Sequence, residues 1–472
     1  MASLIWLSDR SRYETGTGRC GMQRYLGTHA GPSGYGYGSK AESVPLTTGT
    51  ASHEGLGGLA TILRDTDILP TPEQVRSVIA KIRADYETKL TEKGFRGGMY
   101  TSPIIDETIK EQSTLIHGLV WTIALRFIPW LHQTYRVLEV EQERLHFFDC
   151  TCGAGPLAEQ AAHDAKGCTG KALMIRTDIL AQHRIGQHLA YFEGKTTGWE
   201  SDAWAEQWET KPQLGLGTLD LAHKYGQDVS EIYVVGMSKG SRKKSDSDKG
   251  LPDDAPLKGM KRQQSSLCYG YCRPGNPPLA KDDWVPSYEW ITDAGEVKRK
   301  SKAHVRRGVW ELKESDWAVW KAYSSDDPLM VPEEFWCRQL PTSVLDKVVF
   351  VLGPMNRQDA QLASLRTGMK AEEERWQGIL WELYELQTKG FGWETTEFQT
   401  KIDALVPRSW NCRPFGKEHE CIFIPLCFKH AGWQNPLSMN RYQLRRPHHA
   451  PELAQAVERG LLIADAVEVE EE

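Results

Sequence analysis

The sequence predicts an α/β protein in which a mixed central sheet is flanked by helices. The first observation is a β-hairpin signature over Ala172–Thr197, where two apolar runs flank a short polar turn at Arg184–Gln187. The second is the order of elements around this hairpin. An alternating strand pattern over 135–148 precedes it, and a helical stretch and a short buried strand at 231–237 follow it.

Helical patterns lie on both sides of this region. An apolar stripe of Leu56, Leu59, Ala60 and Leu63 predicts a helix over 47–65, entered through Thr or Ser caps, with His53 in its first turn. Residues 70–135 are predicted to be largely helical, and residues 355–403 to form a long amphipathic helix and a second one. A lone histidine near a helix start is commonly a surface or capping residue, and that interpretation of His53 stays open.

The hairpin carries the acidic residues that first indicate a site. If the turn centres at 184–187, Asp178 lies directly across from Glu193, and strand alternation puts Tyr191, Glu193 and Lys195 on one face. Two carboxylates so close repel unless a proton or cation lies between them, and oxygen ligands on a sheet suit Mg²⁺ or Mn²⁺. The alternative is a cross-strand salt bridge at the surface. Glu141, on the preceding strand, is a possible supporting acid, with a structural or exposed role as the favoured alternative.

Composition limits the classes of function. The chain has 472 residues and a formal net charge of −6. The overall charge of the protein therefore gives no indication of a nucleic-acid partner. No run of about 18 uninterrupted apolar residues occurs, and we expect a cytoplasmic protein without a membrane partner. In a reducing compartment the ten cysteines indicate metal ligands or buried thiols rather than disulfides.

Local patterns give weaker signals. Six basic residues near Trp310 suit a nucleic-acid backbone, with a solvated basic loop as the alternative: Lys298, Arg299, Lys300, Lys302, Arg306 and Arg307. The phrase GMSKG at 236–240 matches a nucleophile elbow but precedes a charged loop rather than a helix, which disfavours a serine hydrolase. The phrase GCTGKA lacks the residues of a phosphate-binding loop.

Taken together, these segments resemble the PD-(D/E)XK nuclease superfamily, in particular its RecB-like branch of iron–sulfur exonucleases, which includes CRISPR-associated and phage members. The matching motifs are ordered along the chain: GTASHEG with His53, RTDIL with Asp178, FEGKTT with Glu193 and Lys195, and KPQLGLG with Gln213. The resemblance covers residues 1–240 and 405–430. Four residues after Gln213, where the family usually has a tyrosine, this chain has Gly217.

The resemblance implies a restriction-endonuclease-like core with helical insertions and a cysteine-ligated cluster that clasps the two chain ends. Cys20, Cys412, Cys421 and Cys427 fit the layout of a 4Fe-4S cluster, with structural zinc as the alternative. Gly21 follows Cys20, where the family often has proline, and Cys412 is widely separated from Cys421. Cys150, Cys152 and Cys168 form a rival set, for which buried or surface thiols are the simpler interpretation.

The implied domain boundaries follow the motifs. An N-terminal segment (1–70) carries the first cysteine and the histidine helix, and a helical insertion (71–135) precedes the nuclease core (136–240). A charged loop and helical region (241–405), the cysteine motif (406–430) and a tail (431–472) complete the chain.

The resemblance further implies a metal-dependent deoxyribonuclease, with an exonuclease of recombination, repair or phage DNA metabolism as the expected form. Asp178 and Glu193 would hold Mg²⁺ or Mn²⁺ with His53, Lys195 would assist the attacking water, and Gln213 would contact the site or the DNA. Recombination or replication proteins are possible partners. The rival interpretations are a catalytically idle DNA-binding or assembly protein, a zinc-stapled structural protein, and a sequence-specific endonuclease on the same fold.

Overall fold

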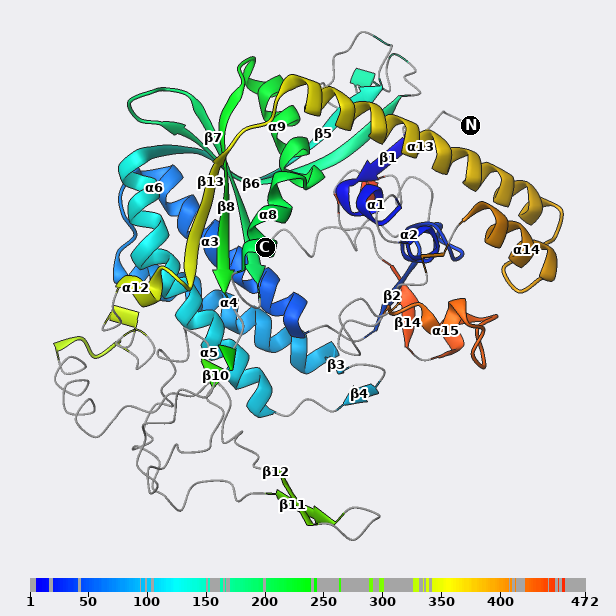
Figure 1. Ribbon diagram of the computed structural model, residues 1–472, viewed down its shortest axis with the longest axis horizontal. Helices are drawn as coiled ribbons and strands as arrows, with labels where there is room; N and C mark the ends of the chain where they lie inside the picture. The colour runs from blue at the N-terminus through cyan, green and yellow to red at the C-terminus, as the bar shows by residue number, and fades with distance from the viewer. Residues whose placement is uncertain are drawn as a thin grey trace.

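A computed structural model provides the structure of the chain. It describes residues 6–16, 20–40, 44–93, 95–97, 100–102, 106–149, 152, 162–163, 166, 170–197, 201–238, 242–243, 263–264, 288–291, 297–300, 326–330, 334, 337–338, 342–406, 408–409, 412, 421–439, 441–445, 449 and 452–454. In this part of the chain the architecture is mixed α/β, with a central sheet flanked by helices (Figure 1).

The central sheet has six strands: β1 (Trp6–Asp9), β5 (Tyr135–Asp149), β6 (Lys171–His183), β7 (Leu189–Thr197), β8 (Val229–Ser238) and β13 (Val349–Met355). The β6–β7 and β5–β6 pairs are antiparallel, as is β8–β13, whereas β1–β6 and β7–β8 are parallel. The smaller strands form separate pairs: β2 (Tyr37–Ser39) with β14 (Tyr442–Leu444), β3 (Phe95–Gly97) with β4 (Tyr100–Ser102), β9 (Arg242–Lys243) with β10 (Gln263–Gln264), and β11 (Tyr288–Ile291) with β12 (Val297–Lys300).

One edge of β6 changes its partner along its length. β5 pairs with β6 from Lys171 to His183, so β1 and β7 must share the opposite edge. β1 pairs with Lys171–Met174, and β7 pairs with Ile179–Gln182. Residues 175–178 therefore face a gap between the end of β1 and the splayed end of β7, and Asp178 lies at its margin.

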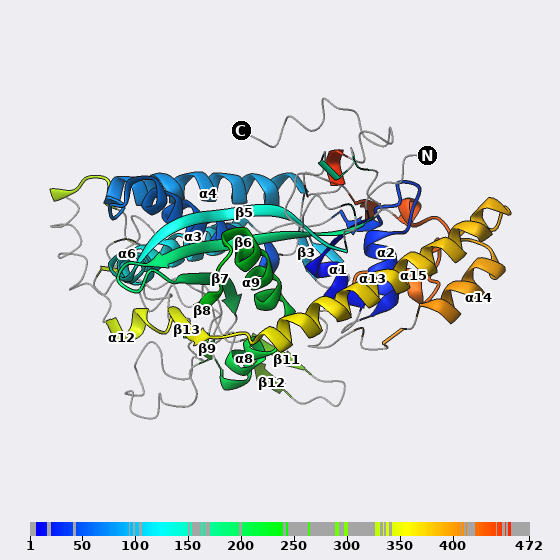
Figure 2. The ribbon, with the colours of Figure 1, turned by 90° about the horizontal axis from the view of Figure 1, so that it is seen from above.

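Two layers of helix cover the sheet (Figure 2). On one face lie α3 (Val44–Thr66), α4 (Pro72–Lys93), α5 (Asp106–Thr122), the π turn η2 (Ile123–Phe127) and α6 (Ile128–Thr134). Their apolar side chains form one core with the strand residues Ile179, Ala190 and Phe192. On the other face lie α8 (Asp202–Glu206), the 3-10 turn η3 (Gln207–Glu209) and α9 (Pro212–Tyr225), which pack on Leu180 and Tyr191.

A second core joins the two ends of the chain beside the sheet. It brings α2 (Gly21–Thr28) together with α13 (Asp359–Thr388), α14 (Thr396–Leu405) and α15 (Ile424–Cys427). The remaining elements are α1 (Arg10–Glu14), α12 (Thr342–Leu345) and the 3-10 turn η8 (Pro436–Met439). Because β2 also pairs with β14, segments some 400 positions apart in sequence lie side by side (Figure 1).

One helical segment of the described residues, Leu115–Thr134, is long and apolar enough to span a membrane. Two-thirds of its most apolar window is buried within the protein. Leu119, Phe127 and Leu131 are fully or almost fully buried in the core beneath the sheet, so the segment's apolar character is accounted for by packing.

The structure confirms the expected hairpin, whose turn lies between His183 and Leu189, and the order of strands around it. The helices expected at 47–65 and 355–403 are present as α3 and as α13 with α14. The placement of His53 in a first helical turn was wrong, because α3 already begins at Val44 and His53 lies in its middle.

The core beneath the sheet gives a stability prediction. Leu59 of α3 is fully buried, whereas Leu46 on the same helix is 73% exposed. We expect Leu59→Ala to lower the free energy of unfolding by about 2–5 kcal/mol through lost burial and a residual cavity. Leu46→Ala, the matched control, should change it by less than about 0.5 kcal/mol. Urea unfolding of both variants checks this, and equal shifts would contradict the assignment of this core.

Candidate active site

Three carboxylates lie in a row across three adjacent strands. The β6–β7 ladder ends at Ile179 opposite Phe192, so Asp178 and Glu193, which were predicted to lie directly opposite each other, are the first residues beyond its last pair. On the other side, Val140 pairs with Ile179 and Gln142 with Thr177, which places Glu141 opposite Asp178. Asp178 is therefore flanked by an acid on each neighbouring strand, at the point where the sheet opens.

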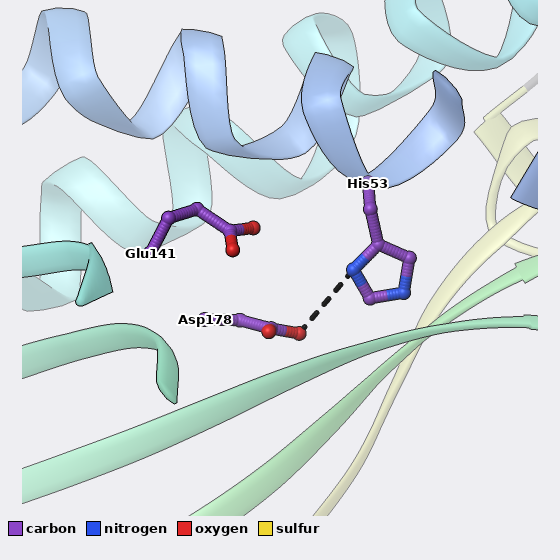
Figure 3. A group of neighbouring side chains, drawn as sticks. All are labelled: His53, Glu141 and Asp178. Carbon is purple, nitrogen blue, oxygen red and sulfur yellow. Dashed lines mark ion pairs between the residues drawn. The ribbon is translucent and has the colours of Figure 1, made fainter. Parts of the chain in front are cut away.

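His53 approaches this row from the helical layer. Its side chain and those of Glu141 and Asp178 point toward one another from α3, β5 and β6 (Figure 3). His53 Nδ1 lies 3.4 Å from Asp178 Oδ2, and one ligand atom from each of the three residues lies within 4.8 Å of the others. Among the described residues this is the one group of three or more His, Cys, Asp or Glu side chains that is close enough to share an ion. Sequence reasoning expected His53 and Asp178 here.

Glu141 was a possible supporting acid in the sequence, but a structural or exposed role was favoured. The alternating pattern of β5 could not decide between these roles, because Glu141 breaks that alternation with a left-handed backbone at φ 51°. This conformation is unfavourable for a residue with a side chain, and such strain is typical of functional positions. Its register opposite Asp178 was the one available signal, but it required the β5–β6 pairing to be known.

The small residues around the row allow the close approach. The Gly194 N–H donates to Asp178 Oδ2 at 2.7 Å, which the splayed strand end makes possible. A Cβ at Gly194 would lie 2.8 Å from Leu56 Cδ2 and 3.1 Å from His53 Cε1. A Cβ at Gly57 would lie 3.1 Å from Glu141 Cγ. Glycine at both positions therefore lets α3 lie directly on the acidic row.

Burial and crowding change the protonation of the group. Burial and the neighbouring Asp178 carboxylate raise the pKa of Glu141 to about 7. Burial also raises the pKa of Asp178, although Lys195 opposes this effect. Burial lowers the pKa of His53 to about 3, so its imidazole is neutral and able to bind a cation. A half-buried cluster of two acids and a neutral histidine is a donor set that a hard divalent cation would stabilise.

Glu193 is held by polar groups on its own side of the sheet. Its carboxylate accepts hydrogen bonds from the Tyr191 hydroxyl and the Gln213 amide, and Lys195 Nζ lies 2.5 Å from Glu193 Oε1. Arg10 Nη1 lies 4.0 Å from the same oxygen. A carboxylate has about four acceptor positions, so these three close contacts leave one for an ion or water. The structure thus brings Glu193, Lys195 and Gln213 together, as the sequence predicted.

Tyr191 is a second residue that sequence reasoning did not include in the site. A Cβ at Gly217 of α9 would lie 2.7 Å from Tyr191 Cε1, so the glycine leaves the space that the tyrosine ring fills. At the position where the motif departs from the family pattern, a tyrosine from β7 therefore lies instead, with its hydroxyl on Glu193.

A cavity of about 1200 Å³ opens over these residues. Its walls come from the sheet, from one side of α3 and α4, and from the start of α1. The site residues that line it are His53, Glu141, Asp178, Glu193, Lys195, Gln213 and Arg10. The cavity gives a large, charged ligand access to all the candidate groups at once.

The four cysteines of the expected metal cluster also lie near one another. Burial and the nearby thiols of Cys421, Cys20 and Cys412 together raise the pKa of Cys427 to about 12, although Arg408 opposes this effect. The Cys421 N–H donates to the Cys412 carbonyl at 2.8 Å, and Cys20, Cys421 and Cys427 pack against the second core. No three of these sulfurs lie mutually within 4.8 Å.

Other expected residues are only partly described. Lys298, Arg299 and Lys300 lie on β12, whereas Lys302, Arg306 and Arg307 are outside the described residues. Of the rival cysteine set, Cys150 and Cys168 are outside them, and Cys152 Sγ lies 3.4 Å from His163 Nδ1. Ser238 ends β8 as a buried residue whose N–H donates to Val348 O, so it is part of the sheet.

The site gives a prediction about pH. Because the pKa of Glu141 is raised from 4.5 to about 7, the folded protein holds a proton there that the unfolded chain has lost. The contribution of this group to stability is therefore lost as pH rises from about 4.5 to 7. A bound divalent cation favours the charged carboxylate, so Mn²⁺ should raise the melting temperature at about pH 8 and have little effect at about pH 5.5.

Calorimetric melts with and without Mn²⁺ measure this effect. Glu141→Gln should abolish most of the Mn²⁺-dependent stabilisation at the higher pH. Glu385→Gln, which removes an exposed carboxylate of α13, should leave it unchanged. A stabilisation that is independent of pH, or retained in Glu141→Gln, would contradict the assignment.

Comparison with known proteins assigns no family to the chain. A scan against models of known protein families finds no match, and a search of curated proteins finds no significant match.

Proposed function

We propose that this protein is a divalent-metal-dependent nuclease of the PD-(D/E)XK type that hydrolyses DNA phosphodiester bonds. The observation that carries the proposal is the meeting of His53, Glu141 and Asp178 beside Glu193 and Lys195 in one open cavity. Asp178, Glu193 and Lys195 come from the two strands of one hairpin, where the pairing of Ile179 with Phe192 brings Asp178 next to Glu193. An exonuclease is the form that the resemblance favours.

The donor set fits Mg²⁺ or Mn²⁺ at this position. Asp178, Glu141 and His53 would hold the ion, with the remaining acceptor position of Glu193 directed to the same region. Such an ion, when bound, lowers the pKa of water and neutralises charge on a phosphate oxygen. Mn²⁺ suits the mixed oxygen and imidazole donors better than Mg²⁺ does, because Mg²⁺ prefers oxygen alone.

The remaining side chains orient the reaction. Lys195, held by Glu193 at 2.5 Å, would position the attacking water and neutralise negative charge as it develops on the phosphate. Gln213 and Tyr191 donate to Glu193 from either side and so fix the carboxylate that orients Lys195. Hydrolysis then proceeds without a covalent intermediate, since no nucleophilic side chain is required.

We also propose that Cys20, Cys412, Cys421 and Cys427 hold a 4Fe-4S cluster. The proximity of the four thiols and the packing of Cys20, Cys421 and Cys427 on the second core support one shared metal site, and the resemblance favours iron–sulfur over zinc there. The cluster would link the segment that precedes α2 to the segment around α15. Ligand binding there would contribute directly to folding free energy, because it joins the two ends of the chain.

Removal of the lysine amine tests the nuclease. Lys195→Ala should lower kcat for Mn²⁺-dependent cleavage of end-labelled single- and double-stranded DNA by about 10³-fold, because it removes a charge that acts in the transition state. DNA binding and the melting temperature should change little. The control is Lys347→Ala, an exposed lysine ahead of β13, which should cleave normally. Undiminished metal-dependent cleavage by Lys195→Ala would refute its role.

The metal content of the purified protein tests the proposed cysteine cluster site. Protein purified without oxygen should be brown and contain about four iron and four sulfide ions per chain. Cys427→Ser should lose most of the iron and melt at a lower temperature. Cys337→Ala, at a buried cysteine of the sheet core, should keep its iron. A colourless protein with about one zinc per chain would instead support a structural zinc site.

A further inference from the structure

We propose that Arg10 is the residue that binds the scissile phosphate, opposite the ion-binding side chains. The inference rests on the proposed nuclease function and adds to it a contact that none of the recognised motifs contains. Arg10 is the first residue of α1 and follows β1 directly, at the gap where β1 and β7 leave the edge of β6. It lines the cavity together with Asp178, Glu193 and Lys195.

The hydrogen-bonding capacity of Arg10 is unused among the described residues. Its nearest acidic group, Glu193 Oε1, lies 4.0 Å away, which is an ion-pair distance but too long for a hydrogen bond. The side chain is 38% exposed, on the cavity side. The two other cations near the acidic row are more closely bound. Lys195 lies 2.5 Å from Glu193, and Arg176 Nε donates to Glu141 at 2.7 Å.

Hydrogen bonds and ion pairs of the neighbouring residues fix the backbone at Arg10. Asp9 caps α1 by accepting from the Arg12 N–H at 2.9 Å, and both residues are buried. The Arg12 guanidinium forms an ion pair with Glu452 and donates to Leu7 O at 2.9 Å. His449 lies 3.9 Å from Asp9 and 2.6 Å from Glu143 of β5. These contacts fix the start of α1 against β1 and β5, so the Arg10 guanidinium enters the cavity from a fixed point.

The balance of charge indicates what Arg10 binds. Within the acidic row and its nearest cations, the three carboxylates of Glu141, Asp178 and Glu193 face Arg10, Arg176 and Lys195. With a divalent ion bound, the site carries an excess of about two positive charges. A phosphodiester anion and an attacking hydroxide together balance this excess. A guanidinium group can donate two parallel hydrogen bonds to two oxygens of one phosphate. Of these three cations, Arg10 is the one without a close hydrogen-bond acceptor among the described residues.

The reaction that follows is a balanced hydrolysis. Water supplies the oxygen that forms the new bond to phosphorus, and the bond from phosphorus to the leaving sugar oxygen breaks. The proton from water ends on that sugar oxygen by way of solvent. Arg10 takes no proton and donates only hydrogen bonds to the phosphate oxygens, as negative charge increases on them in the transition state.

The test compares Arg10→Ala, Arg10→Lys and the control Arg64→Ala, which removes an arginine that pairs with Asp65 away from the cavity. We expect Arg10→Ala to lower kcat for cleavage of a single-stranded oligonucleotide with Mn²⁺ by about 10²-fold or more. Its Mn²⁺ affinity, measured by calorimetry, should stay within about twofold of the wild type, because Arg10 is not a ligand. Arg10→Lys should be intermediate, and Arg64→Ala normal. Guanidinium ion should partly restore Arg10→Ala but not Lys195→Ala.

A second measurement identifies the partner of Arg10. Replacing one charged linkage of the oligonucleotide by an uncharged methylphosphonate removes the anion that Arg10 should bind. Cleavage at that linkage should fall much more in the wild type than in Arg10→Ala, which is a non-additive result. Equal losses in both proteins, or cleavage by Arg10→Ala within about threefold of the wild type, would overturn the inference.

The outcome also separates this inference from the proposed function. If the wild type cleaves no DNA with any divalent ion, the nuclease proposal fails. Anisotropy measurements of oligonucleotide binding without metal then decide the role of Arg10, because loss of affinity in Arg10→Ala supports phosphate binding and unchanged affinity refutes it.

Discussion

The interrupted pairing along one edge of β6 is the constraint on which the site depends. β5 covers the whole of the opposite edge, while β1 and β7 each cover one end of this one. Asp178 lies at the margin of the gap between them and lines the cavity. The Gly194 N–H donates to its carboxylate there, and Arg10 reaches the cavity from the end of β1. A continuous ladder would use these backbone groups within the sheet, so the proposed site depends on this break.

The acidic row is unfavourable in the absence of a cation, and the fold supports it from both sides. Glu141 has a strained backbone and a pKa raised to about 7, and Glu193 is held by Tyr191, Gln213 and Lys195. The helix that supplies His53 packs directly on this row through Gly57. The ion pairs of Arg12 with Glu452 and of His449 with Glu143 bring the last described segment of the chain to the same end of the cavity. The chain ends are thus part of the site's support.

The parts that could be predicted from sequence are those set by local pattern. Strand alternation and the two apolar runs on either side of the polar turn predicted the hairpin and its register. That prediction placed Asp178, Glu193 and Lys195 close together. The apolar stripe predicted α3 but not its start, because Val44–Ser52 lack a clear stripe, and so His53 was placed in the wrong turn. Arg10 was not found in this way, while Tyr191 was placed on the correct face without a role and the role of Glu141 was left open. The roles of these residues depend on the pairing of strands that are distant in sequence, and on Gly217, whose importance is visible only beside the tyrosine ring that it accommodates.

The central claim is that His53, Glu141 and Asp178 hold a divalent cation that serves hydrolysis at this cavity. Anomalous diffraction from a crystal soaked in Mn²⁺ tests it most directly. The account predicts a peak within about 2.0–2.6 Å of one donor atom from each of the three side chains, and its absence from crystals of Asp178→Asn. A crystal with Mn²⁺ bound elsewhere and none at these residues would contradict the claim.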